Sequence, residues 1–105
     1  MNLYIYKIAL RDQNAVNVFT SMVVCCENES IARRIHPQND KFVYDSLTEQ
    51  WKNTETSQIV NYIHYYTEGW INGLYINDLD VTLLGKAIKD NVPKGVVCAS
   101  YVSDL

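Results

Sequence analysis

The sequence lacks long apolar runs and concentrated charge of either sign. No window approaches the length of a membrane span, and the first residues do not form a basic segment followed by an apolar core. The nine basic residues are scattered, apart from the adjacent Arg33 and Arg34, and the net charge is −3. Binding to duplex DNA requires a concentrated basic surface. We therefore expect a cytoplasmic protein with no membrane association and no sequence-specific DNA binding.

Glycine and proline are also scarce, with four and two residues respectively in a chain of 105. Hydrophobic residues make up 48% of the chain and charged residues 20%, which is typical of globular proteins. This composition excludes a disordered chain, because disorder requires few apolar residues and a high net charge. At this length we expect a single domain spanning residues 1–105.

Cysteine is limited to three residues, Cys25, Cys26 and Cys98. An odd number does not suit the disulfide framework of a small secreted domain, and the C-x-x-C spacing of zinc sites is absent. Adjacent cysteines on a strand also point to opposite faces, which does not suit a shared metal ion. Because all three lie in apolar runs, we expect buried, reduced thiols, with no metal ion and no cofactor.

Four apolar segments of β-type composition lie toward the two ends of the chain. Leu3 to Leu10 and Val16 to Cys26 are separated by a polar break, so we expect them to form an antiparallel hairpin. Asp80 to Ala87 and Gly95 to Val102 are expected to form a closing pair of strands. Together they predict the α+β class, with a small, mainly antiparallel four-stranded sheet and one short helix on a face.

The helix is predicted between Asn28 and His36. Asn28 can cap the first turn, and Pro37 stops the run directly after His36. Ile31 and Ile35 are four residues apart and would share the face that packs on the sheet. His36 would then stand at the carboxyl end, where the helix dipole favours an imidazolium.

An aromatic-rich insertion at about 42–78 separates these segments. Eight of the twelve aromatic residues fall within it. Residues 41–44 suit a brief strand, and residues 46–57 are expected to form a polar surface loop that contains Trp51. No catalytic motif accompanies the aromatic residues.

The second half of the insertion admits a helix or a hairpin. Residues 59–66 place apolar and aromatic side chains on one helical face, whereas their β-branched and aromatic content suits a strand; the helix is preferred. The Asn72–Gly73 pair between apolar flanks predicts a tight two-residue hairpin turn. If residues 59–66 form a strand instead, the insertion becomes a small sheet of its own.

Three flanking segments resemble a group of known proteins. Val23–Pro37 (VVCCENESIARRIHP), Val81–Ala87 (VTLLGKA) and Pro93–Tyr101 (PKGVVCASY) are similar to a family of small uncharacterised accessory proteins encoded by bacteriophages and prophages. In that family a strand leads into a short helix ending in His-Pro, and a Lys-Gly pair precedes a C-terminal strand. The resemblance implies a viral origin, the host cytoplasm as location, and a binding role directed at a host enzyme, a defence complex or a defence signal. It supplies no catalytic residues.

The aromatic insertion supplies the candidate site. Tyrosine and tryptophan give large, stiff contact surfaces with a polar end, and their ring faces also stack on bases. We expect exposed aromatic residues here, assisted by the arginine pair, to bind a ligand or a partner. The candidate residues are Tyr62, His64, Tyr65, Tyr66, Trp70, Tyr75, Arg33 and Arg34.

Three functions are compatible with this site. The preferred hypothesis is a non-enzymatic anti-defence protein that sequesters a nucleotide-type immune signal, with aromatic rings stacking on the base and arginines pairing with phosphate. The alternative is an inhibitor or adaptor that anchors the same aromatic residues on a host protein. A more distant alternative is a small hydrolase that depends on His64. A homo-oligomer is compatible with all three, since a pocket in so small a chain forms readily between subunits.

Overall fold

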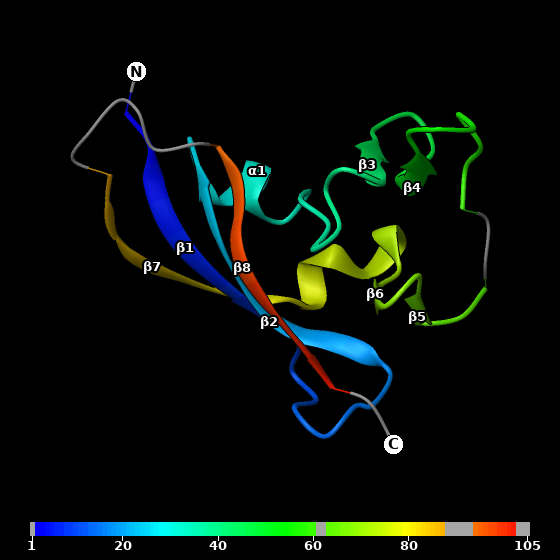
Figure 1. Cartoon of the computed structure of the whole chain (residues 1–105), viewed down its shortest axis with the longest axis horizontal. Coiled ribbons are helices and arrows are strands. Elements are labelled where there is room, and N and C mark those ends of the chain that lie inside the picture. Colours follow the sequence, from blue (N-terminus) through cyan, green and yellow to red (C-terminus); the bar gives the residue numbers. More distant parts are fainter. Residues whose placement is uncertain (1, 61–62, 88–93, 103–105) are drawn as a thin grey trace.

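The computed structural model describes residues 2–60, 63–87 and 94–102. A four-stranded antiparallel sheet occupies one side of the molecule, and the middle segment, residues 38–79, lies on the other (Figure 1). The fold is therefore dominated by antiparallel strands, with few short helices. The strands of the sheet are β1 (Tyr4–Ala9), β2 (Val18–Cys26), β7 (Asp80–Lys86) and β8 (Gly95–Val102), in the order β7-β1-β2-β8.

The first two strands form the hairpin that the sequence predicts. Tyr6 lies opposite Val24 and Ile8 lies opposite Met22, and all four side chains are buried. Because side chains alternate along a strand, these residues line one face of the sheet, the face that packs on the rest of the molecule. The prediction of a four-stranded antiparallel sheet is confirmed.

The two C-terminal strands do not pair with each other, so the predicted closing pair is wrong. β7 pairs with β1 and β8 pairs with β2, which places them at opposite edges of the sheet. A lone hairpin presents two open edges with unpaired backbone groups. Each C-terminal strand completes one of these edges.

The predicted helix is present but much shorter than expected. Helix α1 (Glu29–Ala32) begins after Asn28, whose side-chain oxygen accepts a hydrogen bond from Ile31 N at 2.9 Å. The helix ends after about one turn, and Ile35 instead forms an isolated bridge with Val43 of the middle segment. Ile31 is 37% exposed, so its predicted inward orientation is wrong, and the buried residue of α1 is its last.

Two hairpins and a 3-10 helix make up the ordered elements of the middle segment. These are β3 (Phe42–Asp45) with β4 (Gln50–Asn53), β5 (Tyr66–Thr67) with β6 (Trp70–Ile71), and η1 (Gly73–Asp78). The brief strand expected at 41–44 is confirmed, with bounds one residue later. The polar surface loop expected at 46–57 is wrong, because its centre pairs as β4 and Trp51 is fully buried.

The turn of the second hairpin lies at Glu68 and Gly69, whereas the sequence predicted Asn72 and Gly73. Glu68 and Gly69 both have positive φ, 53° and 76°, as the favoured two-residue hairpin turn requires. Asn72 instead caps η1, because its side-chain oxygen accepts a hydrogen bond from Leu74 N at 3.0 Å. The predicted hairpin turn is therefore the start of a helix.

The helix preferred for residues 59–66 is also wrong where the structure describes it. Ile59 forms a bridge with Lys52 of β4, and Tyr66 begins β5. Tyr62 lies outside the described residues. The strand alternative is closer to the structure, since the middle segment contains two small antiparallel sheets of its own.

Gly73 allows η1 to approach β4 closely. A β-carbon at this position would lie 2.7 Å from the carbonyl oxygen of Glu49 and 2.9 Å from the Cα of Gln50. Both are backbone atoms, so a larger residue would force the chain to move. The glycine that suggested a hairpin turn is thus required for packing between two elements.

One continuous core joins the sheet to the middle segment. On the sheet side it contains Ile8 and Met22, and on the other side Trp51, Trp70 and Ile71, each at most 2% exposed. The two layers therefore share their buried apolar surface. A substitution in either layer should affect the stability of both.

The cysteines follow the expectation only in part. Cys25 and Cys26 are buried in β2, but Cys98 in the edge strand β8 is exposed, so the prediction of three buried thiols is wrong for Cys98. All three are free thiols. An apolar sequence run does not distinguish an inner strand from an edge strand, and only the strand order separates them.

Candidate functional site

The aromatic residues of the middle segment divide into a buried set and an exposed set. Phe42, Trp51 and Trp70 are at most 6% exposed and belong to the core. The indole nitrogen of Trp51 donates a hydrogen bond to the carbonyl oxygen of Ile71 at 2.8 Å, which fixes the ring between the two hairpins. Trp70, predicted as an exposed binding residue, is fully buried and cannot contact a partner while the protein is folded.

Three tyrosines form a contiguous group that reaches the surface, which we call the tyrosine cluster: Tyr65, Tyr66 and Tyr75. The ring centroid of Tyr65 lies 4.9 Å from that of Tyr66 and 5.0 Å from that of Tyr75. Tyr65 and Tyr75 are 39% and 38% exposed, and Tyr66 is half-buried. The cluster combines the loop before β5, the first residue of β5 and η1, so tyrosines from three neighbouring elements are brought together.

A hydrogen bond holds the central ring of the cluster in place. The Tyr65 hydroxyl donates a hydrogen bond at 2.9 Å to the carboxylate of Asp78, the last residue of η1. Partial burial, followed by this hydrogen bond and the Asp78 charge, raises the pKa of Tyr65 to about 12. The Tyr65 hydroxyl is therefore protonated and oriented at neutral pH.

Apolar side chains flank the cluster along the chain. Leu74, beside Tyr75 in η1, is 50% exposed, and Ile63, two residues before Tyr65, is 93% exposed. Next to Ile63, the exposed His64 lies in a loop whose backbone is held from within, because its carbonyl oxygen accepts a hydrogen bond from Asn72 Nδ2 at 3.0 Å. Neither residue was predicted from the sequence; Leu74 is identified by its position beside Tyr75 in η1, and Ile63 by its exposure.

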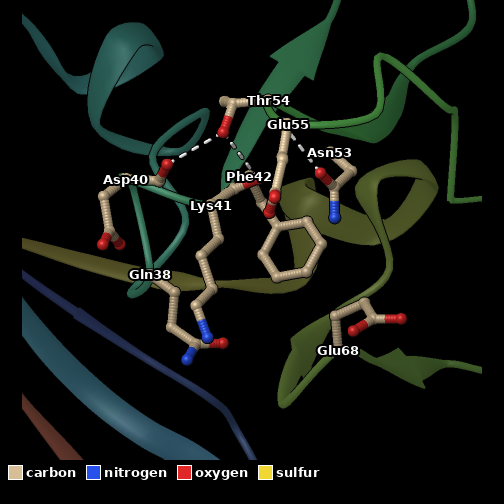
Figure 2. Close-up of a pocket in the computed structure, with 8 residues that line it drawn as sticks. All are labelled: Gln38, Asp40, Lys41, Phe42, Asn53, Thr54, Glu55 and Glu68. Carbon is tan, nitrogen blue, oxygen red and sulfur yellow. Dashed lines mark hydrogen bonds between the residues drawn. The ribbon is translucent and has the colours of Figure 1, made fainter.

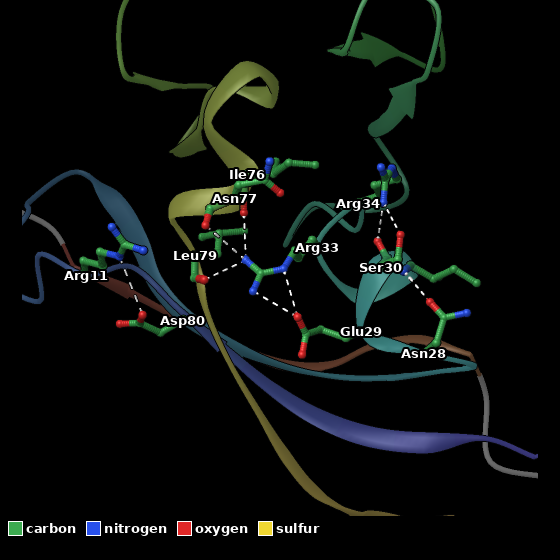
Figure 3. Close-up of polar contacts among 11 residues, drawn as sticks. Arg11, Asn28, Glu29, Ser30, Arg33, Arg34, Ile76, Asn77, Leu79 and Asp80 are labelled. Atoms are coloured by element: carbon green, nitrogen blue, oxygen red, sulfur yellow. Dashed lines mark hydrogen bonds and ion pairs between the residues drawn. The ribbon is translucent and has the colours of Figure 1, made fainter.

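Arg33 performs a structural role, contrary to its prediction as a binding residue. Its guanidinium donates to the carbonyl oxygens of Ile76 and Leu79 at 3.1 and 2.7 Å, and it pairs with Glu29 at 3.1 Å (Figure 3). These carbonyls lie at the end of η1, so Arg33 connects α1 to the middle segment. A guanidinium with these partners is not free to bind a phosphate.

Arg34 is exposed but is also engaged locally. It donates to the backbone carbonyl of Ser30 at 2.7 Å, and its guanidinium carbon lies 5.3 Å from the ring centroid of Tyr44. This stacking on an aromatic face orients the arginine toward β3. The structure therefore does not bring the arginine pair together with the tyrosine cluster as one hydrogen-bonded site.

An open pocket of about 500 Å³ lies on the middle segment (Figure 2). Its lining includes the carboxylates of Asp40, Glu55 and Glu68, with Lys41 as the one basic residue among those that line it. Acidic side chains outnumber basic ones, so the pocket repels phosphate and favours a cationic group. It does not suit the nucleotide-type ligand that the sequence suggested.

Negative charge is concentrated in the middle segment as a whole. Residues 38–79 carry six acidic and two basic side chains, whereas the rest of the chain has six acidic and seven basic ones. The acidic residues are Asp40, Asp45, Glu49, Glu55, Glu68 and Asp78, and the basic residues are Lys41 and Lys52. The tyrosine cluster therefore belongs to the acidic part of the chain.

His36 is buried in the core and does not cap a helix, because α1 ends before it. Its ring lies 4.8 Å from Phe42 and 5.1 Å from Trp51, between centroids, and its Nδ1 accepts a hydrogen bond from Gln38 N at 2.9 Å. Nε2 has no hydrogen-bond partner among the described residues. Burial lowers the pKa of His36 to about 4, although a backbone group of Glu68 opposes the shift weakly.

No protein-family model matches the chain, and no curated protein or solved structure is detectably similar to it. Within the described ranges, no helix has the length and apolar character needed to cross a membrane. In the same parts of the chain, no group of three or more His, Cys, Asp and Glu side chains is placed to hold a metal ion. The candidate site therefore rests on the tyrosine cluster and its charge environment.

Proposed function

We propose that this protein is a non-enzymatic binding protein that uses the tyrosine cluster to engage a partner protein with a basic surface. The exposed, mutually packed rings of Tyr65 and Tyr75 carry the proposal. Tyrosines in such arrangements supply contact area at low entropic cost, because their rings are already ordered before binding. The hydrogen bond from Tyr65 to Asp78 adds to this order.

The charge of the middle segment supports a basic partner. Opposite charges around an aromatic anchor accelerate association and select among partners, even where they add little affinity. The acidic pocket with Asp40, Glu55 and Glu68 offers a place for a lysine or arginine side chain of such a partner. These features therefore support an inhibitor or adaptor that binds a partner protein more strongly than a protein that sequesters a nucleotide.

The viral origin and the anti-defence role are parts of this proposal that rest on the resemblance of the flanking segments. Small phage accessory proteins act mainly by binding a host enzyme, a defence complex or a defence signal, and a domain with exposed aromatic residues suits the first two of these roles. The host target would be an enzyme or a defence complex with a basic surface near its functional site. Blocking that surface would be sufficient for inhibition.

The proposal is tested by isolating partners from a bacterial host with the tagged protein and measuring affinity for the purified candidate. Tyr65→Ala is expected to weaken binding by about 2 kcal/mol or more, roughly thirtyfold, as for other aromatic anchors. Leu47→Ala, an equally apolar but 94% exposed residue in the turn between β3 and β4, should leave affinity unchanged. Added salt should slow association.

Two results would contradict the proposal. The first is a partner whose affinity is the same for the wild type and for Tyr65→Ala. The second is a nucleotide found by mass spectrometry in stoichiometric amount on protein purified from a defence-active host. That result would favour the signal-sequestering hypothesis and move the site away from the acidic surface.

A further inference from the structure

The two edges of the sheet differ in charge. β7 begins with Asp80 and ends with Lys86, whereas none of the eight residues of β8 is charged. Pairing with the inner strands is irregular at one position for β7 and at two positions for β8, so charge and not regular pairing distinguishes the two edges. Charged residues on an edge strand protect it from pairing with another chain. β8 lacks this protection.

β8 also exposes apolar side chains along its length. Val97 and Tyr101 are 58% and 53% exposed, and the three small residues between them are exposed as well. Among the described residues, no strand pairs with the outer edge of β8 (Figure 1). An uncharged, apolar edge of this length is a template for another strand.

The sequence of β8 is nearly symmetric about Ala99. Counting outward from Ala99, Cys98 matches Ser100 in size, Val97 matches the apolar Tyr101, and Val96 matches a second valine at 102. In a two-fold antiparallel pair, a residue on the axis faces its own copy, and the residue before it faces the residue after it. Such a pair of β8 strands would therefore match small with small and large with large.

We propose that β8 pairs with β8 of a second copy, antiparallel and centred on Ala99, so that two four-stranded sheets form one continuous sheet of eight strands. In this register Val97 faces Tyr101 of the second copy on both sides of the axis, a favourable pair of β-branched and aromatic residues.

The small area expected for this interface indicates a weak dimer. One strand pair with two flanking aromatic contacts buries less than a standard interface of about 1,600 Å², so a dissociation constant on the order of micromolar is expected. The dimer leaves the tyrosine cluster available, since that cluster lies on the middle segment and not on β8. This inference is therefore independent of the proposed function.

Analytical ultracentrifugation of the whole chain over a concentration series tests the pairing. The wild type should change from 12.1 kDa to twice that mass as concentration rises. Ala99→Lys places two lysines opposite each other on the axis, and it should weaken the dimer about tenfold or more because like charges that face each other destabilise a strand pair. Thr82→Lys makes the same change on the exposed edge strand β7 and should leave the dimer intact.

Engineered cysteines test the register, because directly opposite residues on antiparallel strands are close enough for a disulfide. With Cys98→Ser as background, Ala99→Cys should form a covalent dimer on mild oxidation, whereas Ser100→Cys should not. Ser100→Cys with Cys98 retained should form one, because position 98 faces position 100. Three results overturn the proposal: a wild type that stays monomeric at several hundred micromolar, a dimer unaffected by Ala99→Lys, or crosslinks in the opposite pattern.

Discussion

The four-stranded sheet and the middle segment are stabilised in different ways. The sheet depends on a repeating pattern, in which alternate aliphatic side chains of β1 and β2 enter the core. The middle segment depends on individual contacts, such as the indole hydrogen bond of Trp51, the arginine that holds the end of η1, and the close approach at Gly73. A repeating pattern is visible in the local sequence, whereas individual contacts between distant residues are not.

Within the middle segment, different aromatic residues should contribute to stability and to binding. The same segment supplies the buried indoles of the core and the exposed tyrosines of the cluster. Buried rings should affect unfolding, and exposed rings should affect binding. Substitutions of buried and of exposed residues should show which rings belong to the core and whether the sheet and the middle segment unfold as one unit.

The largest effect is expected at Trp51. Trp51→Ala removes a fully buried ring that contacts His36 and Tyr44 and donates to Ile71, so it should lower the free energy of unfolding by about 3 to 5 kcal/mol. Urea denaturation should still show a single transition, because the core is continuous with the sheet. Leu47→Ala is the matched exposed control. Two separate transitions would show that the middle segment unfolds independently.

Acid should destabilise the folded protein through His36. The unfolded chain takes up a proton as the pH falls below about 6.5, whereas the native pKa of about 4 keeps the buried ring neutral. Stability is therefore complete above pH 6.5 and is lost as the pH falls toward 4, by about 2 kcal/mol at pH 5 and about 3 kcal/mol at pH 4. Chemical denaturation at each pH measures this slope.

The control for acid destabilisation replaces each histidine in turn. His36→Asn retains an acceptor for Gln38 N but does not titrate in this range, so its stability should vary much less between pH 6.5 and 5. His64→Asn, at an exposed position, should retain the full pH dependence of the wild type. Identical pH profiles for wild type and His36→Asn would contradict the assignment.

Gly73→Ala should have an intermediate effect. The added β-carbon meets two backbone atoms at less than 3 Å, so the chain must shift, at a cost of about 2 kcal/mol. Gly85→Ala is the matched control in β7, because a β-carbon there meets no described atom within 4 Å. Thermal unfolding of the two variants compares a glycine fixed by packing with one that is not. Equal melting temperatures would mean that η1 and β4 are not held at this distance.

The sequence predicts the sheet better than the middle segment for a physical reason. Alternation in Leu3 to Leu10 and in Val16 to Cys26 is a local signal, and the sheet follows it. The contacts of the middle segment are not local: Trp51 is separated by 20 residues from its acceptor, and Arg33 by 46 residues from the Leu79 carbonyl. A polar stretch around one tryptophan therefore predicted a loop where the structure has a strand and a core residue.

The candidate site was predictable in composition but not in detail. Aromatic enrichment selected Tyr65, Tyr66 and Tyr75, whose rings lie together at or near the surface, and it also selected Trp70, which is buried. Both residues of β6 are buried, and a two-residue strand is too short to show a periodic pattern in the sequence. The strand order was likewise hidden, since β7 and β8 have similar apolar sequences at opposite edges.

The smallest effect is expected at the Tyr65 hydroxyl. Tyr65→Phe keeps the ring of the cluster but removes the hydrogen bond to Asp78, so the free energy of unfolding should fall by about 1 kcal/mol or less at neutral pH. The ring is 39% exposed, and solvent partly replaces the lost partner. Tyr101→Phe on β8 is the matched control on the sheet.

An alkaline titration tests the same hydroxyl. Followed by ultraviolet absorbance, Tyr65→Phe should lose one tyrosine that ionises near pH 12. Since the native pKa is raised above the unfolded value of about 10, the stabilisation is complete below pH 10 and is lost as the pH rises toward 12. A loss of several kcal/mol in Tyr65→Phe would instead assign Tyr65 to the core and leave Tyr75 as the only exposed anchor of the cluster.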